Sequence, residues 1–323
     1  MYVDTVVQDK LVHKPVFALG LLVAFTALFF LFNFTESVFG HFLSPVIGDP
    51  KTSGHYGRFV VAFVLAILLV INIIIIAFFP RKIQILTVWI ELFLLALTIG
   101  ILFQLDLVFI KSKLWFMITQ GVFTTLYVSA ISIFIASILA IIGAVAKLSN
   151  NAFAYAIATF YTSLFRGLPL LIQVYIIYLG LPQLGYVVDA IPAGIAALSL
   201  CYGAYMTEIF RAGIESIPRG QWEGSRAMGF KFGLTMRKII LPQAIPLIIP
   251  PTGNQFIAML KDSSLVSVIG VWELMFLART LGVKTFQHIE MLMTAALIYW
   301  IMTMILEFFQ SKLEAHYRQK RSL

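Results

Sequence analysis

The sequence predicts an all-α membrane protein, a polytopic bundle of about eight transmembrane helices. Sixty per cent of the 323 residues are hydrophobic and only 12% are charged, and the mean hydropathy is +0.95. A soluble globular protein is typically about 45–50% apolar and about 25% charged. The formal net charge is +8, an excess that in a membrane protein is typical of cytoplasmic loops rather than of nucleic-acid binding.

Eight apolar stretches are long enough to cross a bilayer, which takes about 20 residues of helix. The first follows Lys10 and Lys14 like the start of a signal peptide, but no small-residue cleavage pattern comes after it, so we expect it to be retained. The fourth and fifth are longer than a bilayer requires, and Pro169 predicts a break in the fifth. The predicted spans are residues 15–34, 59–79, 83–105, 116–146, 153–182, 191–210, 243–260 and 286–310.

The positions of lysine and arginine predict that both termini are cytoplasmic. With the N-terminus inside, 15 of the 23 basic residues lie in inner segments and 7 in outer segments. Basic residues are concentrated on the cytoplasmic side of membrane proteins. The long polar segment 211–242 is then cytoplasmic as well.

The chain is predicted to divide into residues 1–112, with three accessory spans, and residues 113–323, with a core of about five. The first three spans are rich in Ile, Leu, Val and Phe, whereas the later ones carry the glycines, prolines and polar residues. Glu91 is the one ionisable residue deep in the accessory spans. Because charge inside a span is costly, Glu91 is either a proton or solute site or a hydrogen-bonded contact to the core or to another protomer.

The segment 218–242 is the most informative part of the chain, because it is a polar, basic, glycine-containing island between apolar spans. We expect a short helix from about Gln221 to Met228 that ends at Gly229, since glycine is favoured just past a helix end. Leu241 and Pro242 then restart the chain into the membrane, because proline is tolerated in a first turn. The segment is either a contact site for a soluble partner or an ordinary basic inner loop.

The next segment is rich in prolines, with Pro246, Pro250 and Pro251 close to Gly253. The helix is therefore predicted to be bent or interrupted, which at membrane depth is tolerated only against protein or a wet cavity. We expect this helix to line a translocation route. The candidate residues that follow the prolines are Asn254, Gln255, Lys261, Asp262, Ser263 and Ser264.

Lys261 and Asp262 are expected near the outer leaflet. They either meet the carboxylate and the ammonium of a zwitterionic solute or form a pair with each other, which would contribute only about 0–1 kcal/mol if exposed.

Other polar residues also fall within or near the spans. Arg166 and Gln173 are seven residues apart, which on a continuous helix places them on one face. Arg166 is either a functional charge or a cap for the carbonyls freed by Pro169. Glu208 and Arg211 are three residues apart at an inner helix end, and we expect them to pair with each other or with the cytoplasmic loop.

Several kinds of site are not indicated by the sequence. There is no phosphate-binding loop and no Gly-Lys dipeptide, so the chain supplies no ATP site of that class. The single cysteine, Cys201, excludes an internal disulfide, and the five histidines lack metal-ligand spacing. No nucleophile–base arrangement stands out, so we expect neither an enzyme nor a cofactor or metal in this chain.

Five motifs occur in order after Gly121 and Thr125. They are Phe165-Arg166-Gly167-Leu168-Pro169-Leu170-Leu171-Ile172-Gln173, Ala204-Tyr205-Met206-Thr207-Glu208-Ile209-Phe210-Arg211, Ser216-Ile217-Pro218-Arg219-Gly220-Gln221, Leu241-Pro242-Gln243-Ala244 with Pro250-Pro251 and Asn254, and Leu260-Lys261-Asp262-Ser263-Ser264-Leu265. With this order and spacing, about 200 residues resemble permeases of the polar amino acid uptake family of ABC transporters. The family's Glu-Ala-Ala is Glu223-Gly224-Ser225 here, and the three accessory spans are an addition.

The resemblance implies a type I ABC importer permease core that imports a polar amino acid across a bacterial inner membrane by alternating access. It also implies a separate ATPase subunit, which binds ATP and Mg and docks on residues 219–242. A periplasmic or lipid-anchored binding protein and a second permease subunit, identical or paralogous, are the other expected partners. The implied coupling residues are Gly220, Gln221, Glu223, Gly224, Ser225, Gly229, Leu241 and Pro242.

Two alternatives belong to other classes. A secondary transporter or channel would be driven by an ion gradient through Glu91 and Asp262, and would make no use of residues 219–242. A membrane scaffold would have no pathway, but the proline-rich helix and Asn254, which we expect to be buried, argue against it.

Overall fold

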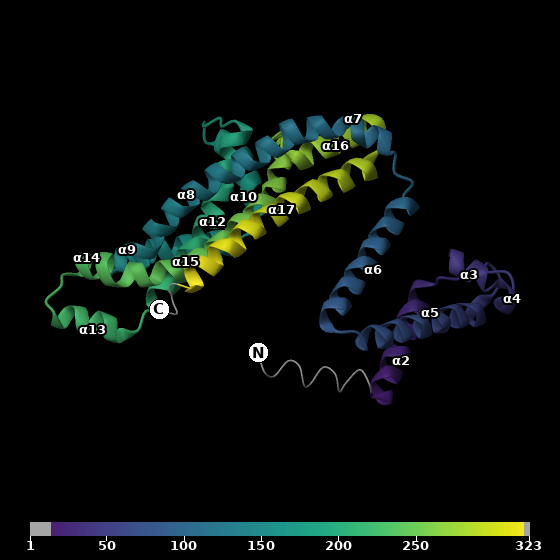
Figure 1. Cartoon of the computed structure of the whole chain (residues 1–323). Helices are drawn as coiled ribbons and strands as arrows, with labels where there is room; N and C mark the ends of the chain where they lie inside the picture. The colour runs from purple at the N-terminus through teal and green to yellow at the C-terminus, as the bar shows by residue number, and fades with distance from the viewer. Residues whose placement is uncertain (1–13, 320–323) are drawn as a thin grey trace. The chain divides into compact units, whose positions relative to one another are not determined.

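The computed structural model describes residues 14–319 (Figure 1). Its described residues are helical with connecting turns and contain no strand. They form two compact units, which are described separately below: one ends at Gln104 and the other begins at Leu105. The assignment of residues 1–112 to accessory helices and 113–323 to a core stays a prediction.

The first unit is built around two packed helices, α2 (Pro15–Phe32) and α5 (Gly54–Ala77). The guanidinium of Arg58 donates to the carbonyls of Phe30 and Leu31, which are left without intrahelical partners at the end of α2. It also lies 4.8 Å from the centre of the Phe30 ring. The remaining helices of this unit are α3 (Val38–Phe42), α4 (Ser44–Ile47) and α6 (Arg81–Leu102).

Glu91 lies on α6 and accepts a 3.0 Å hydrogen bond from Nδ2 of Asn72 on α5. The contact that we expected with the core or with another protomer is therefore made within the first unit. The Asn72 amide gives the Glu91 carboxylate a hydrogen-bond donor, which its apolar surroundings would otherwise not supply.

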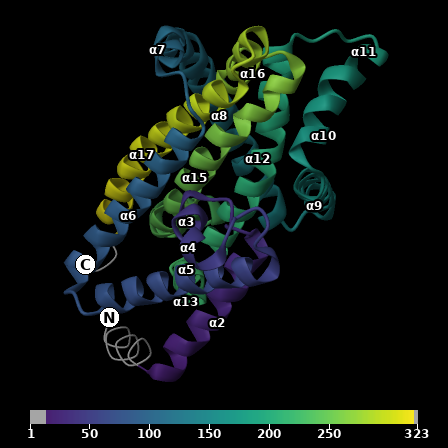
Figure 2. The ribbon, with the colours of Figure 1, turned by 90° about the vertical axis from the view of Figure 1, so that its right-hand side faces the viewer.

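The second unit contains the remaining helices (Figure 2). In chain order its elements are α7 (Leu107–Phe116), the π-helical turn η1 (Met117–Val122), α8 (Phe123–Leu148), α9 (Ala152–Gly167), α10 (Leu170–Tyr175), η2 (Ile176–Gly180), α11 (Leu181–Gln183), α12 (Ala190–Glu215), α13 (Arg219–Ala227), α14 (Phe232–Thr235), η3 (Met236–Ile240), α15 (Leu241–Asp262), η4 (Ser263–Ile269), α16 (Leu274–Thr285) and α17 (His288–Gln319).

Helix α12 is at the centre of this unit and packs against α8, α9 and α15. Small residues permit the close approach, as is usual between membrane helices. A Cβ on Gly143 of α8 would lie 2.4 Å from Oγ1 of Thr207, and a Cβ on Gly203 of α12 would lie 2.6 Å from the hydroxyl of Tyr161 and 3.0 Å from Cβ of Leu139. The glycines therefore set how near α8, α9 and α12 come to each other.

All eight predicted spans correspond to helices of the structure. Within residues 14–319, seven helices are long and apolar enough to cross a membrane, and α9 with α10–α11 makes an eighth if the bent pair is one span. The helices mostly extend beyond the predicted limits, because polar residues at their ends continue the helix past the apolar stretch. The break predicted at Pro169 is confirmed, with a bend of 107°.

Of the two alternatives predicted for the proline-rich span, a bend or an interruption, the interruption does not occur. Helix α15 runs from Leu241 to Asp262 through Pro246, Pro250 and Pro251. Each proline removes one intrahelical hydrogen bond, but packing against α12 and α17 holds the helix. Nor does the chain restart at Leu241, because the helical path begins already at Phe232 and passes through η3 into α15.

Replacing Gly203 by valine is expected to lower the free energy of unfolding by about 1–3 kcal/mol, because overpacking forces its neighbours apart. Valine at Gly20, where a Cβ would meet nothing within 4 Å, is the matched control and is expected to have little effect. Thermal unfolding of the full chain in detergent measures both. Equal losses at the two positions would contradict the close packing of α8, α9 and α12.

Candidate functional site

The break between α9 and α10 is closed by Gln173. Its side chain is buried at 3% exposure, and Nε2 donates to the carbonyls of Phe165 and Leu168, each at 2.9 Å. These carbonyls belong to the end of α9, where intrahelical donors are missing. The bend places Arg166 and Gln173 on different helices, so the prediction that they share one face is wrong. The carbonyl cap suggested for Arg166 is supplied by Gln173 instead.

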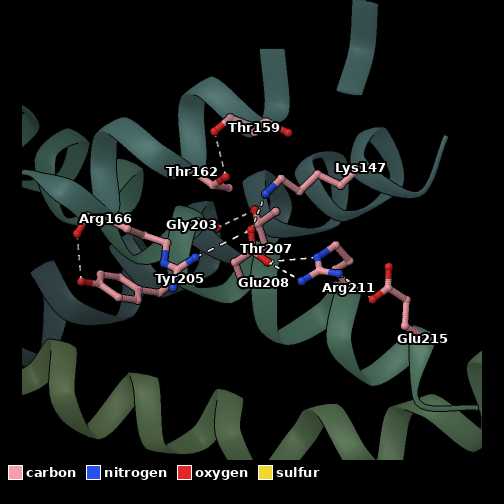
Figure 3. Close-up of polar contacts among 10 residues, drawn as sticks. All are labelled: Lys147, Thr159, Thr162, Arg166, Gly203, Tyr205, Thr207, Glu208, Arg211 and Glu215. Atoms are coloured by element: carbon pink, nitrogen blue, oxygen red, sulfur yellow. Dashed lines mark hydrogen bonds and ion pairs between the residues drawn. The ribbon is translucent and has the colours of Figure 1, made fainter. Parts of the chain in front are cut away.

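Arg166 takes part in a group of five charged residues that we call the charge cluster (Figure 3). Glu208 of α12 is its centre and contacts three cations. Its carboxylate contacts Nζ of Lys147, lies 2.9 Å from Nη2 of Arg211 and lies 3.7 Å from Nη1 of Arg166. Arg211 also bonds to Glu215 at 2.5 Å. The predicted pairing of Glu208 with Arg211 is confirmed.

A cavity of about 460 Å³ opens beside the cluster. Asp262 lines it and accepts a 2.7 Å hydrogen bond from the hydroxyl of Tyr202. The guanidinium of Arg166, which lines it too, lies 5.4 Å from the centre of the Tyr205 ring. We call this space the Arg166–Asp262 cavity; its walls are Arg166, Gly167, Leu168, Pro169, Leu170, Cys201, Tyr202, Tyr205, Gln255 and Asp262.

Asp262 lies beside the middle of α12. Its hydrogen-bond partner Tyr202 is halfway along that helix (Ala190–Glu215). The position of Asp262 relative to the outer leaflet stays a prediction. Lys261 is exposed, and the described residues contain no ion pair between Lys261 and Asp262.

The other pathway candidates have different surroundings. Gln255 is half-buried at the cavity, whereas Asn254 is exposed in the single chain, contrary to the burial that we predicted. Ser263 is fully buried and donates to the carbonyl of Leu260 at 2.7 Å, a bond within its own helical turn. Ser264 is half-buried.

The polar segment forms the short helix that the sequence predicts, α13, with bounds Arg219–Ala227. Gly229 follows with φ of +76°, a left-handed conformation that glycine adopts easily. Phe230 N donates to the carbonyl of Ser225 at 3.0 Å, which closes the helix end. Gly229 therefore ends the helix as predicted.

Helix α13 has one packed and one exposed side. Ser225 is buried at 1% exposure, and Trp222 packs on the hydrophobic cluster that contains Ile214, Ile217 and Ile240. A second cavity, of about 490 Å³, lies between this packed side and the end of α12, and Glu215 lines it. The exposed residues are Gly220, Gln221, Glu223, Gly224 and, beyond the helix, Gly229 and Pro242; Leu241 is half-buried.

Sequence reasoning missed Lys147, Tyr202 and Tyr205. Lys147 is in the last turn of α8, where a basic residue also suits the helix dipole. The two tyrosines lie in an apolar span, and only their partners Asp262 and Arg166 reveal a role. For the two tyrosines, the one signal in the sequence was a polar hydroxyl inside a predicted apolar span.

The helical architecture and the broken span are those of a multi-pass membrane protein. Residues 136–319 match the family described as "Binding-protein-dependent transport system inner membrane component". The chain belongs to this family, and it has the fold of a type I ABC importer permease.

Two related permeases and one solved structure resemble this chain over most of their own length. The arginine transport system permease ArtQ of Bacillus subtilis is 41% identical over 61% of this chain and 90% of its own length. The L-cystine permease TcyB of the same organism is 37% identical, over 68% and 93%. A crystal structure of an amino acid ABC transporter with histidines matches 65% of this chain and 98% of its own, with a TM-score of 0.62 and 34% identity.

Replacing Gln173 by methionine is expected to lower the free energy of unfolding by about 1–3 kcal/mol, because the carbonyls of Phe165 and Leu168 lose their donor. The control is methionine at Gln183, which is exposed and is expected to tolerate the change. Thermal unfolding in detergent compares the two variants with the unchanged protein. A Gln173 variant as stable as the control would show that the cap is dispensable.

Proposed function

We propose that this chain is the permease subunit that carries a polar amino acid across the inner membrane by alternating access, with ATP hydrolysed on a separate subunit. The names of the relatives, which include arginine, cystine and glutamine transport, support the substrate class. The single observation that carries the proposal is the Arg166–Asp262 cavity, because it holds a cation and an anion within a membrane bundle.

The charges of the cavity suit a zwitterion. Arg166 binds the carboxylate, for which the guanidinium fork is well shaped, and Asp262 binds the ammonium group. This arrangement replaces the pair of Lys261 and Asp262 that the sequence indicated. A charge inside a membrane bundle is costly unless it is paired or functional, and a cavity of about 460 Å³ lies within the usual size range of small-molecule sites.

Helix α13 is the docking site that we propose for the ATPase subunit, which also holds ATP and Mg. Its exposed glycines, Gly220 and Gly224, let a partner approach closely, and Glu223 offers it a charge. The packed side makes the contact rigid, because Trp222 and Ser225 fix α13 to the bundle. Both termini are then cytoplasmic.

One permease chain is proposed to form only half of the translocation route, so further partners are expected. A second permease copy or a paralogue completes the route, and a binding protein delivers the solute at the outer face. The relatives belong to transport systems, which supports this assembly.

Replacing Glu223 by arginine is expected to abolish solute-stimulated ATP hydrolysis, because it reverses the charge of an exposed residue of α13. The chain is reconstituted in liposomes with its ATPase subunit and binding protein, and L-arginine, L-glutamine and L-cystine are offered in turn. Arginine at Glu36, which is exposed on the first unit, is the matched control. Normal hydrolysis and uptake by the Glu223 variant would contradict the docking site, and uptake without ATP would favour a gradient-driven transporter.

Replacing Asp262 by asparagine is expected to weaken the binding of the amino acid to the cavity by about 10- to 100-fold, because a charged hydrogen bond contributes about 1.5–3 kcal/mol. Equilibrium binding of radiolabelled L-arginine and L-glutamine to the purified permease–ATPase complex measures the loss. Asparagine at Asp189, an exposed residue outside this cavity, should leave binding unchanged. Unaltered binding by the Asp262 variant would remove this residue from the substrate site.

A further inference from the structure

We propose that Glu208 is an internal anion that competes with the carboxylate of the solute for Arg166, and thereby promotes release of the solute on the inner side. The inference rests on the proposed function and assigns Glu208 a positioning role in that same site. It follows from three features of the charge cluster: the shared cation, the unequal contacts and the direction along α12.

Arg166 is the cation that the cavity and the cluster share. It lines the Arg166–Asp262 cavity and also faces Glu208. Its side chain is 42% exposed, whereas that of Lys147 is 10% exposed. Arg166 is therefore the member of the cluster that a molecule in the cavity reaches directly.

The contacts of Glu208 are unequal. Arg211 lies at 2.9 Å and Lys147 is closer still, but Arg166 lies at 3.7 Å, so its contact is the weakest of the three. When Arg166 turns to a solute, Lys147 and Arg211 still neutralise the Glu208 carboxylate. This matters because a half-buried charge left without a partner is strongly unfavourable.

The exchange replaces one carboxylate by another of the same chemistry. Arg166 binds either Glu208 or the carboxylate of the amino acid, so it must leave one ion pair to form a similar one. Binding is then weaker than Arg166 alone would give, and Glu208 can reclaim Arg166 when the solute moves. A transport site requires such moderate affinity, because a solute that is held too tightly does not leave.

The position of Glu208 along α12 gives the exchange a direction. Glu208 is six residues after Tyr202, which is about 9 Å of helix towards the cytoplasmic end. The contact between Arg166 and Glu208 is therefore on the inner side of the contact between Tyr202 and Asp262. The carboxylate of the solute faces the exit, next to the anion that displaces it.

The test is equilibrium binding to the purified permease–ATPase complex without ATP or binding protein. The probes are L-arginine and L-glutamine, together with L-argininamide and L-glutaminamide, which lack the carboxylate. Replacing Glu208 by glutamine is expected to tighten binding of the amino acids by about two- to fivefold, the range of a partly exposed ion pair. Binding of the amides is expected to stay unchanged, and the uptake turnover in liposomes to fall.

The matched control is glutamine at Glu215, which removes a partner of Arg211 but does not line the Arg166–Asp262 cavity. This variant is expected to bind all four probes like the unchanged protein. If the Glu208→Gln chain does not elute as a folded complex, Glu208→Asp takes its place. Aspartate keeps the negative charge and withdraws the carboxylate by about 1.5 Å, the length of one carbon–carbon bond, so tighter binding of the amino acids is again expected.

Four results would overturn the inference. Weaker amino acid binding by both Glu208 variants would mean that Glu208 holds Arg166 ready for the solute, and an equal change for acids and amides would mean a structural effect. A Glu215 variant that behaves like the Glu208 variant would trace the effect to Arg211. If the unchanged complex binds no probe, the proposed substrate class itself is wrong, and the inference falls with it.

Discussion

The structure depends on the rule that polar groups inside an apolar solvent must find their partners within the protein. Nε2 of Gln173 follows this rule at the break of α9, where it donates to two carbonyls. Glu208 obeys it by gathering three cations around one carboxylate. Both groups of contacts lie beside the Arg166–Asp262 cavity. The broken backbone and the charges proposed to bind the solute are therefore held in place within one small region.

The sequence predicted those features that local composition determines. All eight spans, the break at Pro169 and the helix that ends at Gly229 were confirmed, because apolar length, proline and glycine each act on their own stretch of chain. The pairing of Glu208 with Arg211 was predictable for the same reason, since residues three apart on a helix are neighbours. The motifs in the second unit indicated the family that the comparisons then showed.

Features that depend on packing between helices could not be predicted. The prolines of α15 indicated a bend or an interruption, but the helix is not interrupted, because α12 and α17 hold it. Spacing placed Arg166 and Gln173 on one face, yet the 107° bend separates them. The surroundings of Asp262 became clear only from its contact with Tyr202, a residue 60 positions away in the chain whose nearness no local pattern encodes.

The packed side of α13 connects it to two neighbouring helices, α12 and α15. Trp222 packs on the cluster that contains Ile214 of α12, Ile217 just after it and Ile240 just before α15, so we expect a push on α13 to reach both helices together. These helices also carry Tyr202 and Asp262, which are joined by a hydrogen bond. We expect Arg166 on α9 to be the part left behind, so the seam between α9 and the α12–α15 pair is where the passage for the solute would widen.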